Sequence, residues 1–316
     1  MKFTIVGTGG TGGTIGAYLA QAGNDVTFIA RGKHLEAIRE KGLTVHTEHR
    51  GDILIRPAQA ASMDDCHGMP PDVMFVCVKY YSLEDAIAFA KRTAGPDTLI
   101  IPILNVFGTG EVMQQQLPGL TCLDGCMYIV AKIQEPGVIV QPNEMLRIIY
   151  GFRTGQDERL RSKAEELEKV LRAADIRGHF SEHIHRDAMQ KFAFISPMGA
   201  AGLYFDAVSE DFQKEGPVRD MFVGLVREVA AVGAAMGLSF EKDLVTTGLK
   251  LVDSFQPGFR TSMQRDVLAK GPSEFDGLVT RMVELGKRYQ VPVPLYTKIS
   301  AWGKEHHLSL ADGCMD

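Results

Sequence analysis

The chain has 316 residues, which at about 150 residues per domain suggests two domains with sizeable cores. Hydrophobic residues make up 45% and charged residues 23%, so a disordered or fibrous protein is excluded. The 34 basic and 39 acidic residues leave a net charge of -5 without a long block of one sign, which argues against charge-driven binding to nucleic acid or a membrane and favours a small-molecule partner.

No targeting or membrane-spanning segment is evident in the sequence. The long apolar runs are interrupted, or carry a polar residue, before they reach the roughly 18 residues of a spanning helix. The first residues enter a strand pattern without the plan of a signal peptide. The five cysteines are scattered without a CxxC pair: Cys66, Cys77, Cys122, Cys126 and Cys314. We therefore expect reduced thiols, an inert Cys77 in a buried strand, and a cytoplasmic location.

The N-terminal residues predict a strand, a tight turn and a helix. Residues 2–6 are a short apolar strand, and a helical stretch follows the turn and stops near Gly23. The turn has the pattern G-x-G-x-x-G, and we expect cofactor contacts from all six of its residues: Gly7, Thr8, Gly9, Gly10, Thr11 and Gly12. Its first glycine would form the turn, the second would admit a pyrophosphate, and the third would allow close helix–strand packing. The helix N-terminus would bind the anion, although a glycine-rich turn without a ligand is the alternative.

The second strand, residues 25–29, indicates which dinucleotide the turn would bind. An NAD enzyme places a carboxylate at the end of this strand for the 2′-hydroxyl of the ribose, but here Ala30 and Arg31 follow. A guanidinium binds a phosphate through charged hydrogen bonds, so Arg31 predicts NADP. The alternative is that Arg31 is a solvated loop residue.

The next segments alternate between strand and helix patterns. Residues 33–41 predict a helix, and 43–46 with 53–56 predict a hairpin. The buried strands 72–78 and 98–103 flank a helical stretch at 82–93, which indicates a βαβ unit and a parallel sheet. Strand patterns at 127–130, 138–141 and 146–151 suggest an antiparallel extension of that sheet.

From residue 156 onward helical periodicity dominates and no comparable strand pattern returns. Residues 159–173 predict an amphipathic helix, and further helices are expected around 184–206, 216–236, 240–254, 273–289 and 296–305. The predicted fold is therefore α/β: a Rossmann-type NADP-binding domain at 1–181, followed by an all-helical domain at 182–316 that carries substrate and catalytic residues.

The run from 188 to 205 contains one charged side chain, Lys191. A helix this apolar is buried, and a lysine within it would be partly desolvated, which lowers the pKa of an ammonium towards the range useful for proton transfer. The alternatives are a lysine whose ammonium extends to solvent, or one paired with a carboxylate.

Two polar segments interrupt the later helices, at 261–266 and 271–277. In the second, Ser273 is predicted to cap a helix and Asp276 fits the capping-box position. Capping does not explain the carboxylate of Glu274. Either it has a functional role, or it is there because a first-turn carboxylate interacts favourably with the helix dipole.

Taken together, these residues resemble ketopantoate reductase over nearly the whole chain. The resemblance rests on the glycine-rich turn with Arg31, Val78-Lys79 and Asn105 after buried strands, Lys191, and Ser262-Met263 with Glu274 downstream. It implies a Rossmann domain, a helical domain like that of 6-phosphogluconate dehydrogenases, and NADPH-dependent reduction of 2-dehydropantoate in pantothenate and coenzyme A biosynthesis. By this resemblance Lys191 would protonate the ketone oxygen, Asn105 would contact nicotinamide and substrate, and Lys79 would lie beside the cofactor ribose.

The same resemblance assigns three further roles. Ser262 would hold the substrate carboxylate, Glu274 would bind cofactor and substrate hydroxyls, and Ala131 would offer a backbone contact to NADP. The expected cleft lies between the domains.

Two positions depart from the family pattern. Asn105 is followed by Val106 where the family usually has glycine, and Ile195 stands one helical turn after Lys191 where asparagines are common downstream of the lysine. A related NADP-dependent reductase of another 2-oxo acid therefore stays open. A non-catalytic NADP-binding sensor is a separate alternative, and the sequence leaves the oligomeric state open, a homodimer included. No metal site is expected, because the histidines at 179, 183 and 185 do not have the spacing of a site that converges on an ion.

Overall fold

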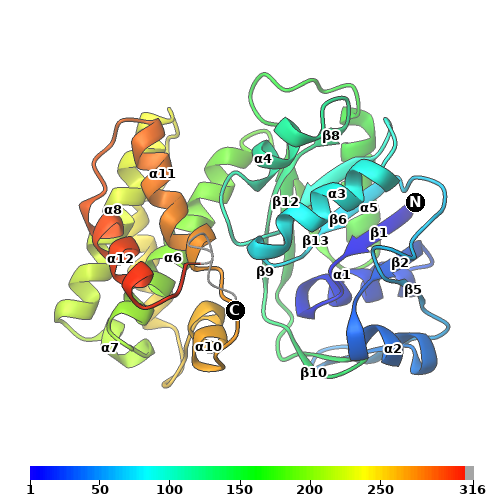
Figure 1. Ribbon diagram of the computed structural model, residues 1–316, viewed down its shortest axis with the longest axis horizontal. Helices are drawn as coiled ribbons and strands as arrows, with labels where there is room; N and C mark the ends of the chain where they lie inside the picture. The colour runs from blue at the N-terminus through cyan, green and yellow to red at the C-terminus, as the bar shows by residue number, and fades with distance from the viewer. Residues whose placement is uncertain (310–316) are drawn as a thin grey trace. The chain divides into compact units, whose positions relative to one another are not determined.

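The computed structural model describes residues 1–309, and the chain divides into two compact units (Figure 1). The first unit comprises Met1–Leu104 and Gly108–Ile184, and the second comprises Asn105–Phe107 together with the described residues that follow Ile184, 185–309. The first unit therefore ends at Ile184. The short segment Asn105–Phe107 belongs with the helices, because the Phe107 ring packs against His185 and Phe192 at centroid distances of 5.8 and 6.2 Å.

The first unit is built on a sheet of six parallel strands in the order β5-β2-β1-β6-β7-β8. Its strands are β1 (Lys2–Val6), β2 (Asp25–Ile29), β5 (Gln59–Ala61), β6 (Val73–Val76), β7 (Leu99–Pro102) and β8 (Thr121–Cys122). The helices of this unit are α1 (Gly10–Gln21), α2 (Gly32–Lys41), the 3-10 turn η1 (Tyr80–Ser82), α3 (Leu83–Thr93), α4 (Thr109–Gln116) and α5 (Arg161–Ala173). The predicted Rossmann-like parallel sheet is confirmed.

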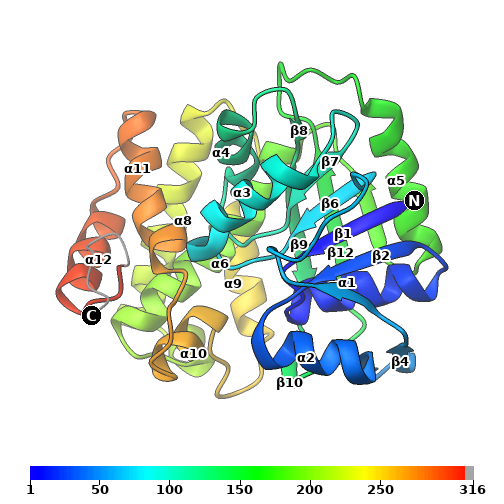
Figure 2. The same ribbon diagram turned by 45° about the vertical axis from the view of Figure 1, so that its right-hand side comes forward.

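Both faces of this sheet are buried, which explains the nearly continuous apolar runs of its strands. On β6, Val73 and Phe75 join a core with α1 and α5, whereas Met74 and Val76 face a second core formed with α3 and α4. Figure 2 shows β1, β2 and β6 side by side with α1 alongside them.

The later strands of the first unit do not extend this sheet, so that prediction is wrong. They form two separate small sheets, one in the order β10-β11-β3-β4 and one in the order β13-β12-β9. The strands of the first small sheet are β3 (Leu43–Thr47), β4 (Gly51–Ile55), β10 (Lys132–Glu135) and β11 (Val138–Gln141). Those of the second are β9 (Asp124–Ile129), β12 (Leu146–Gly151) and β13 (Arg177–Phe180).

Tertiary packing produces this arrangement. Strand β11 pairs in parallel with β3, and its Ile139 presses on α1 so closely that a Cβ on Gly13 would lie 2.2 Å from the Ile139 Cδ1 atom. Strand β13 also overturns the expectation that no strand follows residue 156. Its sequence, Arg-Gly-His-Phe, carries no apolar run, and parallel pairing with β12 makes it a strand.

The described part of the second unit contains helices and connecting segments and no strand. Its elements are α6 (Ile184–Tyr204), α7 (Ser209–Gln213), α8 (Pro217–Ala235), α9 (Leu244–Asp253), α10 (Ser262–Leu268), the π-helix η2 (Asp276–Thr280), α11 (Arg281–Arg288) and α12 (Pro294–Glu305). The short helices α7 and α10 were not predicted. No helix within residues 1–309 has both the length and the apolar character needed to cross a bilayer. Cys314 lies outside the described residues.

Candidate active site

The glycine-rich turn follows β1 directly and leads into α1. Gly7 adopts a φ of +96°, which favours glycine, and the backbone N–H groups of Gly7 and Thr8 both donate to the Ile29 carbonyl oxygen, at 3.1 and 2.9 Å. A Cβ on Gly12 would lie 2.2 Å from the Gly7 carbonyl oxygen. The fold therefore requires glycine at both positions.

Gly9 stands in contrast, because the protein itself gives no reason for a glycine there. It is the N-cap of α1 in an extended conformation with a φ of −80°, and a Cβ at this position would meet no atom within 4 Å. No side chain caps α1, and its first turn holds no acidic residue. The N-terminus of a 12-residue helix thus keeps its dipole and its N–H groups for an anion that approaches beside Gly9.

Gly10 and Thr11 form the first turn of α1, and the loop before β10 lies against it. A Cβ on Gly10 would come within 2.6 Å of the Ala131 carbonyl oxygen. The predicted cofactor-contact residue Ala131 is therefore adjacent to the predicted phosphate turn.

Arg31 lies directly beyond β2, as the N-cap of α2. Its side chain is exposed and makes no ion pair with the residues that the structure describes. No carboxylate follows β2 to accept hydrogen bonds from a 2′-hydroxyl. Arg31 is thus available to a phosphate group on the adenosine ribose.

Lys79 lies at the carboxyl end of β6, where it precedes η1 and is half-buried. It comes from the strand next to β1, so it belongs to the same edge of the sheet as the glycine-rich turn. Burial raises the pKa of the neighbouring Cys77 thiol to about 12, which keeps that thiol protonated and unreactive at neutral pH.

The second unit holds a buried lysine next to an asparagine. Lys191 lies on α6 and is only 7% exposed, so its ammonium does not extend to solvent. The Nζ atom donates a hydrogen bond of 2.8 Å to Oδ1 of Asn105. Apolar packing positions the pair, since Phe107 contacts Phe192, the residue that follows the lysine.

Ser262 and Glu274 belong to the same helical unit as Lys191. Ser262 is the first residue of α10, and Thr261 with Gln264 supplies the capping box, so the Ser262 hydroxyl is not needed as the cap. Glu274 is buried, with 3% exposure. The predicted N-cap role of Ser273 is wrong, because a π-helix begins at Asp276 and no side chain caps it.

The structure also shows the surroundings of the two residues that depart from the family pattern, Val106 and Ile195. Val106 and Phe107 are buried in the helical unit, so bulky residues in this turn serve packing. Ile195 is partly exposed and lies four residues after Lys191, on the same face of α6. The environment on that face of the helix is thus less polar than one with an amide at this position.

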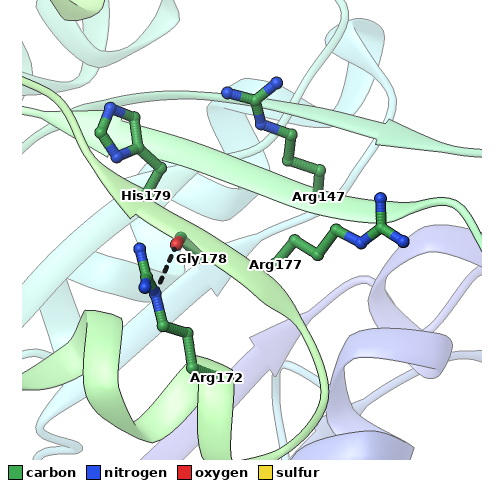
Figure 3. Close-up of a pocket in the computed structure, with 5 residues that line it drawn as sticks. All are labelled: Arg147, Arg172, Arg177, Gly178 and His179. Atoms are coloured by element: carbon green, nitrogen blue, oxygen red, sulfur yellow. Dashed lines mark hydrogen bonds between the residues drawn. The ribbon is translucent and has the colours of Figure 1, made fainter.

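A hollow of about 450 Å³ lies away from these residues, beside β12 and β13 (Figure 3). Its lining residues are Arg147, Arg172, Arg177, Gly178 and His179. The Glu168 carboxylate forms an ion pair with the Arg172 guanidinium at 2.7 Å, and it lies 3.6 Å from Nδ1 of His179. The Glu144 carboxylate lies 3.7 Å from the Arg177 guanidinium. These carboxylates neutralise much of the positive charge, and none of the predicted site residues lines the hollow. Within residues 1–309 no group of three or more potential ligand side chains is arranged to hold a metal ion.

One residue beside the glycine-rich turn, His34, was not predicted from the sequence. It lies on the first turn of α2, three positions after Arg31, and its Nε2 atom is 2.8 Å from the Thr8 carbonyl oxygen in the glycine-rich turn. Its proximity to Arg31 in the sequence was the only available signal.

A Rossmann-like unit with an uncapped, glycine-lined helix N-terminus, followed by an all-helical unit, is the architecture of a nicotinamide-dependent oxidoreductase. The family model for ketopantoate reductase PanE/ApbA matches residues 3–153, and the model for its C-terminal part matches residues 183–305. The chain therefore belongs to the ketopantoate reductase family.

Two distant relatives match nearly the whole chain. An uncharacterized oxidoreductase, YkpB, of Bacillus subtilis is 27% identical over 95% of this chain and 97% of its own length. A 2-dehydropantoate 2-reductase of Mesorhizobium japonicum is 26% identical over 99% of both chains.

Solved structures confirm the fold at still lower identity. The 2-dehydropantoate 2-reductase of Methylococcus capsulatus superposes with a TM-score of 0.85 at 24% identity, covering 98% of this chain and 99% of that one. A D-mandelate dehydrogenase with NADH and anilino(oxo)acetate gives 0.86 at 21% identity, with the same coverage. The fold is thus shared by enzymes that act on different substrates.

Proposed function

We propose that this protein is a cytoplasmic NADPH-dependent reductase that converts 2-dehydropantoate to pantoate, a step of pantothenate and coenzyme A biosynthesis. The observation that carries the proposal is the buried Lys191 ammonium, hydrogen-bonded to Asn105 on an otherwise apolar helix. Family membership supports the reaction class, and relatives named 2-dehydropantoate 2-reductase support the substrate.

Lys191 suits the role of general acid. When bound, the nicotinamide supplies the hydride that reduces the ketone carbon. As negative charge develops on the ketone oxygen, the Lys191 ammonium stabilises it and donates a proton from Nζ. The Oδ1 atom of Asn105 can only accept a hydrogen bond, so it directs one N–H of the ammonium and fixes the position of Nζ.

The first unit fits NADPH through residues that the fold alone does not explain. Gly9 leaves open space beside the N-terminus of α1 for the pyrophosphate. The exposed Arg31 guanidinium would bind the 2′-phosphate, whereas NADH has no group for it to bind there. Lys79 and the Ala131 backbone would contact the rest of the cofactor.

The second unit would bind the substrate. The Ser262 hydroxyl would donate to the substrate carboxylate, and the buried Glu274 would accept hydrogen bonds from hydroxyl groups of substrate and cofactor. Both roles follow from the family resemblance together with the placement of these residues in the same unit as Lys191.

A second candidate is the reduction of a 2-oxo acid with a less polar tail. Ile195 favours it, because this partly exposed apolar side chain follows Lys191 by one helical turn and cannot hydrogen-bond to the hydroxyl end of 2-dehydropantoate.

The test is turnover by the purified full chain on a panel of 2-oxo acids that includes 2-dehydropantoate, followed as NADPH oxidation. We expect 2-dehydropantoate to give the highest kcat/KM. Lys191→Ala should lower kcat by about 10²- to 10⁴-fold with NADPH affinity preserved, because the proton donor is lost while the cofactor contacts remain. Lys287→Ala removes an exposed lysine of α11 and serves as the matched control.

The outcomes separate the alternatives. Turnover of another 2-oxo acid but not of 2-dehydropantoate would overturn the substrate and keep the reductase class. NADPH binding without turnover of any acid on the panel would favour a non-catalytic sensor.

A further inference from the structure

Both ring nitrogens of His34 are hydrogen-bonded to backbone groups from distant segments. Nε2 lies 2.8 Å from the Thr8 carbonyl oxygen in the glycine-rich turn. Nδ1 accepts a 3.0 Å hydrogen bond from the backbone N–H of Gly137, in the turn between β10 and β11. One side chain thus connects α2, the predicted phosphate turn and the β10–β11 hairpin.

These two partners determine the protonation state of the imidazole. A carbonyl oxygen only accepts, so Nε2 must carry a hydrogen, and a backbone N–H only donates, so Nδ1 must be bare. His34 is therefore neutral, with its hydrogen on Nε2. Burial lowers the pKa of His34 below its ordinary value and outweighs the Thr8 hydrogen bond, which raises it.

The residue Thr8 is held at three points as a result. The backbone N–H and the Oγ1 hydroxyl of Thr8 both donate to Ile29, each at 2.9 Å, and the carbonyl accepts from His34. Because the peptide is planar and trans, a Thr8 carbonyl directed at His34 makes the Gly9 N–H point the opposite way. The imidazole thereby orients the first N–H group of the predicted phosphate site.

The second hydrogen bond, from the Gly137 N–H to Nδ1 of His34, acts on the β10–β11 hairpin. Gly137 has a φ of +81° and packs closely on α2, where a Cβ would lie 3.1 Å from that of Ala37. At the other end of β10, Ala131 lies against Gly10. Anchoring Gly137 therefore helps to hold Ala131 beside the first turn of α1.

We propose that neutral His34 is a positioning residue that holds the glycine-rich turn and the β10–β11 hairpin in the geometry that receives the cofactor pyrophosphate. This inference rests on the cofactor site of the proposed function. His34 acts through the backbone of Thr8 and Gly137, so it would contribute equally to NADP and NAD binding.

Protonation would oppose this role, because an imidazolium presents an N–H to the Gly137 N–H. The glycine-rich turn carries no titratable side chain, and the charged groups on the neighbouring segments are all exposed: Arg31, Lys33 and Glu36 on α2, and Lys132 and Glu135 on β10. Nucleotide affinity should thus be highest where His34 is neutral, and it should fall only as the pH drops through the lowered pKa of His34, below the ordinary histidine value of about 6.5.

The test compares three variants of the full chain by calorimetric titration with NADP⁺ and NAD⁺ between pH 5.5 and 8.5. His34→Ala removes both bonds, His34→Gln keeps an N–H near the Nε2 position, and His34→Asn keeps an acceptor near the Nδ1 position. His179→Gln changes an exposed histidine on β13 and serves as the control.

We expect His34→Ala to raise the Kd of both nucleotides by a similar factor, roughly tenfold, which corresponds to the loss of about one buried hydrogen bond. The His34→Gln variant should restore most of the nucleotide affinity, and its affinity should not fall at low pH. NAD⁺ is the informative ligand for the pH profile, because it lacks a 2′-phosphate that itself titrates. Hydrogen exchange of the nucleotide-free protein should be faster at Gly9 and Gly137 in His34→Ala and close to wild type in the control.

Wild-type affinity in His34→Ala, or an unchanged pH profile in His34→Gln, would overturn the positioning role and leave the proposed function intact. If wild type binds neither nucleotide at any pH, the cofactor site itself is wrong, and both proposals are overturned.

Discussion

The glycine-rich turn and the Lys191–Asn105 pair are organised by different physics. The turn is made of consecutive residues, and backbone sterics determine its shape: Gly7 has a positive φ, and Gly12 has no room for a Cβ. The pair joins side chains that are 86 positions apart, and only the packing of Asn105–Phe107 with α6 brings them together. Constraints between neighbouring residues can be recognised in the sequence as a motif. A contact between side chains that are far apart in the sequence can be recognised only in the folded structure.

The largest effect on stability is expected where the glycine-rich turn is most constrained. Gly12→Ala should lower the free energy of unfolding of the first unit by about 3 kcal/mol, the upper part of the usual range for overpacking, because its Cβ would lie 2.2 Å from a backbone oxygen. Gly9→Ala should leave stability unchanged, since its Cβ meets nothing, but weaken NADPH binding by tenfold or more. Thermal unfolding and NADPH titration of both variants check the contrast.

This matched pair separates a glycine that the fold needs from one that the ligand needs. Wild-type NADPH affinity in Gly9→Ala would show that no phosphate approaches Gly9. A fully stable Gly12→Ala would show that the contact with Gly7 relaxes at little cost.

The next effect is a loss of catalytic rate and concerns the Lys191–Asn105 pair. Asn105→Ala should lower kcat by roughly 10- to 100-fold, the equivalent of one hydrogen bond to a charged group, because the Lys191 ammonium loses a partner that positions it. In a Lys191→Ala background the same change should cost little more, since the asparagine then has no ammonium to position. Steady-state kinetics of the two single variants and the double variant measure this coupling, and fully additive losses would contradict it.

The smallest effect concerns the choice between NADPH and NADH, and it is expected at Arg31, which follows β2. Arg31→Ala should raise the Kd of NADPH by about tenfold and leave that of NADH nearly unchanged, because an exposed guanidinium contributes only a moderate charged hydrogen bond to a phosphate. Arg39→Ala, which removes an exposed arginine of the same helix that pairs with Asp65, is the control. Equal weakening of both nucleotides by Arg31→Ala would mean that Arg31 does not bind the 2′-phosphate.

Sequence reasoning predicted the elements that carry a strong local signal. Four of the six parallel strands, β1, β2, β6 and β7, and the long helices were predicted with nearly their observed bounds. The short strands β5 and β8 and the helix α4 were not predicted. Strand β13 was missed because its residues have no β-strand pattern of their own, and the antiparallel extension was wrong because later strands pair with β3 and β13. His34 was missed because both of its hydrogen bonds go to backbone groups, which leave no trace in side-chain motifs.

The sequence by itself determined the glycine-rich turn, the absence of a carboxylate after β2, and the lone lysine in an apolar helix. These features depend on neighbours within a few residues, where backbone sterics and hydrophobic periodicity act. Only the tertiary structure decided that Asn105 belongs with the helical unit, that Gly9 faces open space while Gly12 does not, and that His34 is a neutral link between the turn and a hairpin. Each of these depends on groups brought close by folding, and contact between distant segments is not encoded in the spacing of residues along the chain.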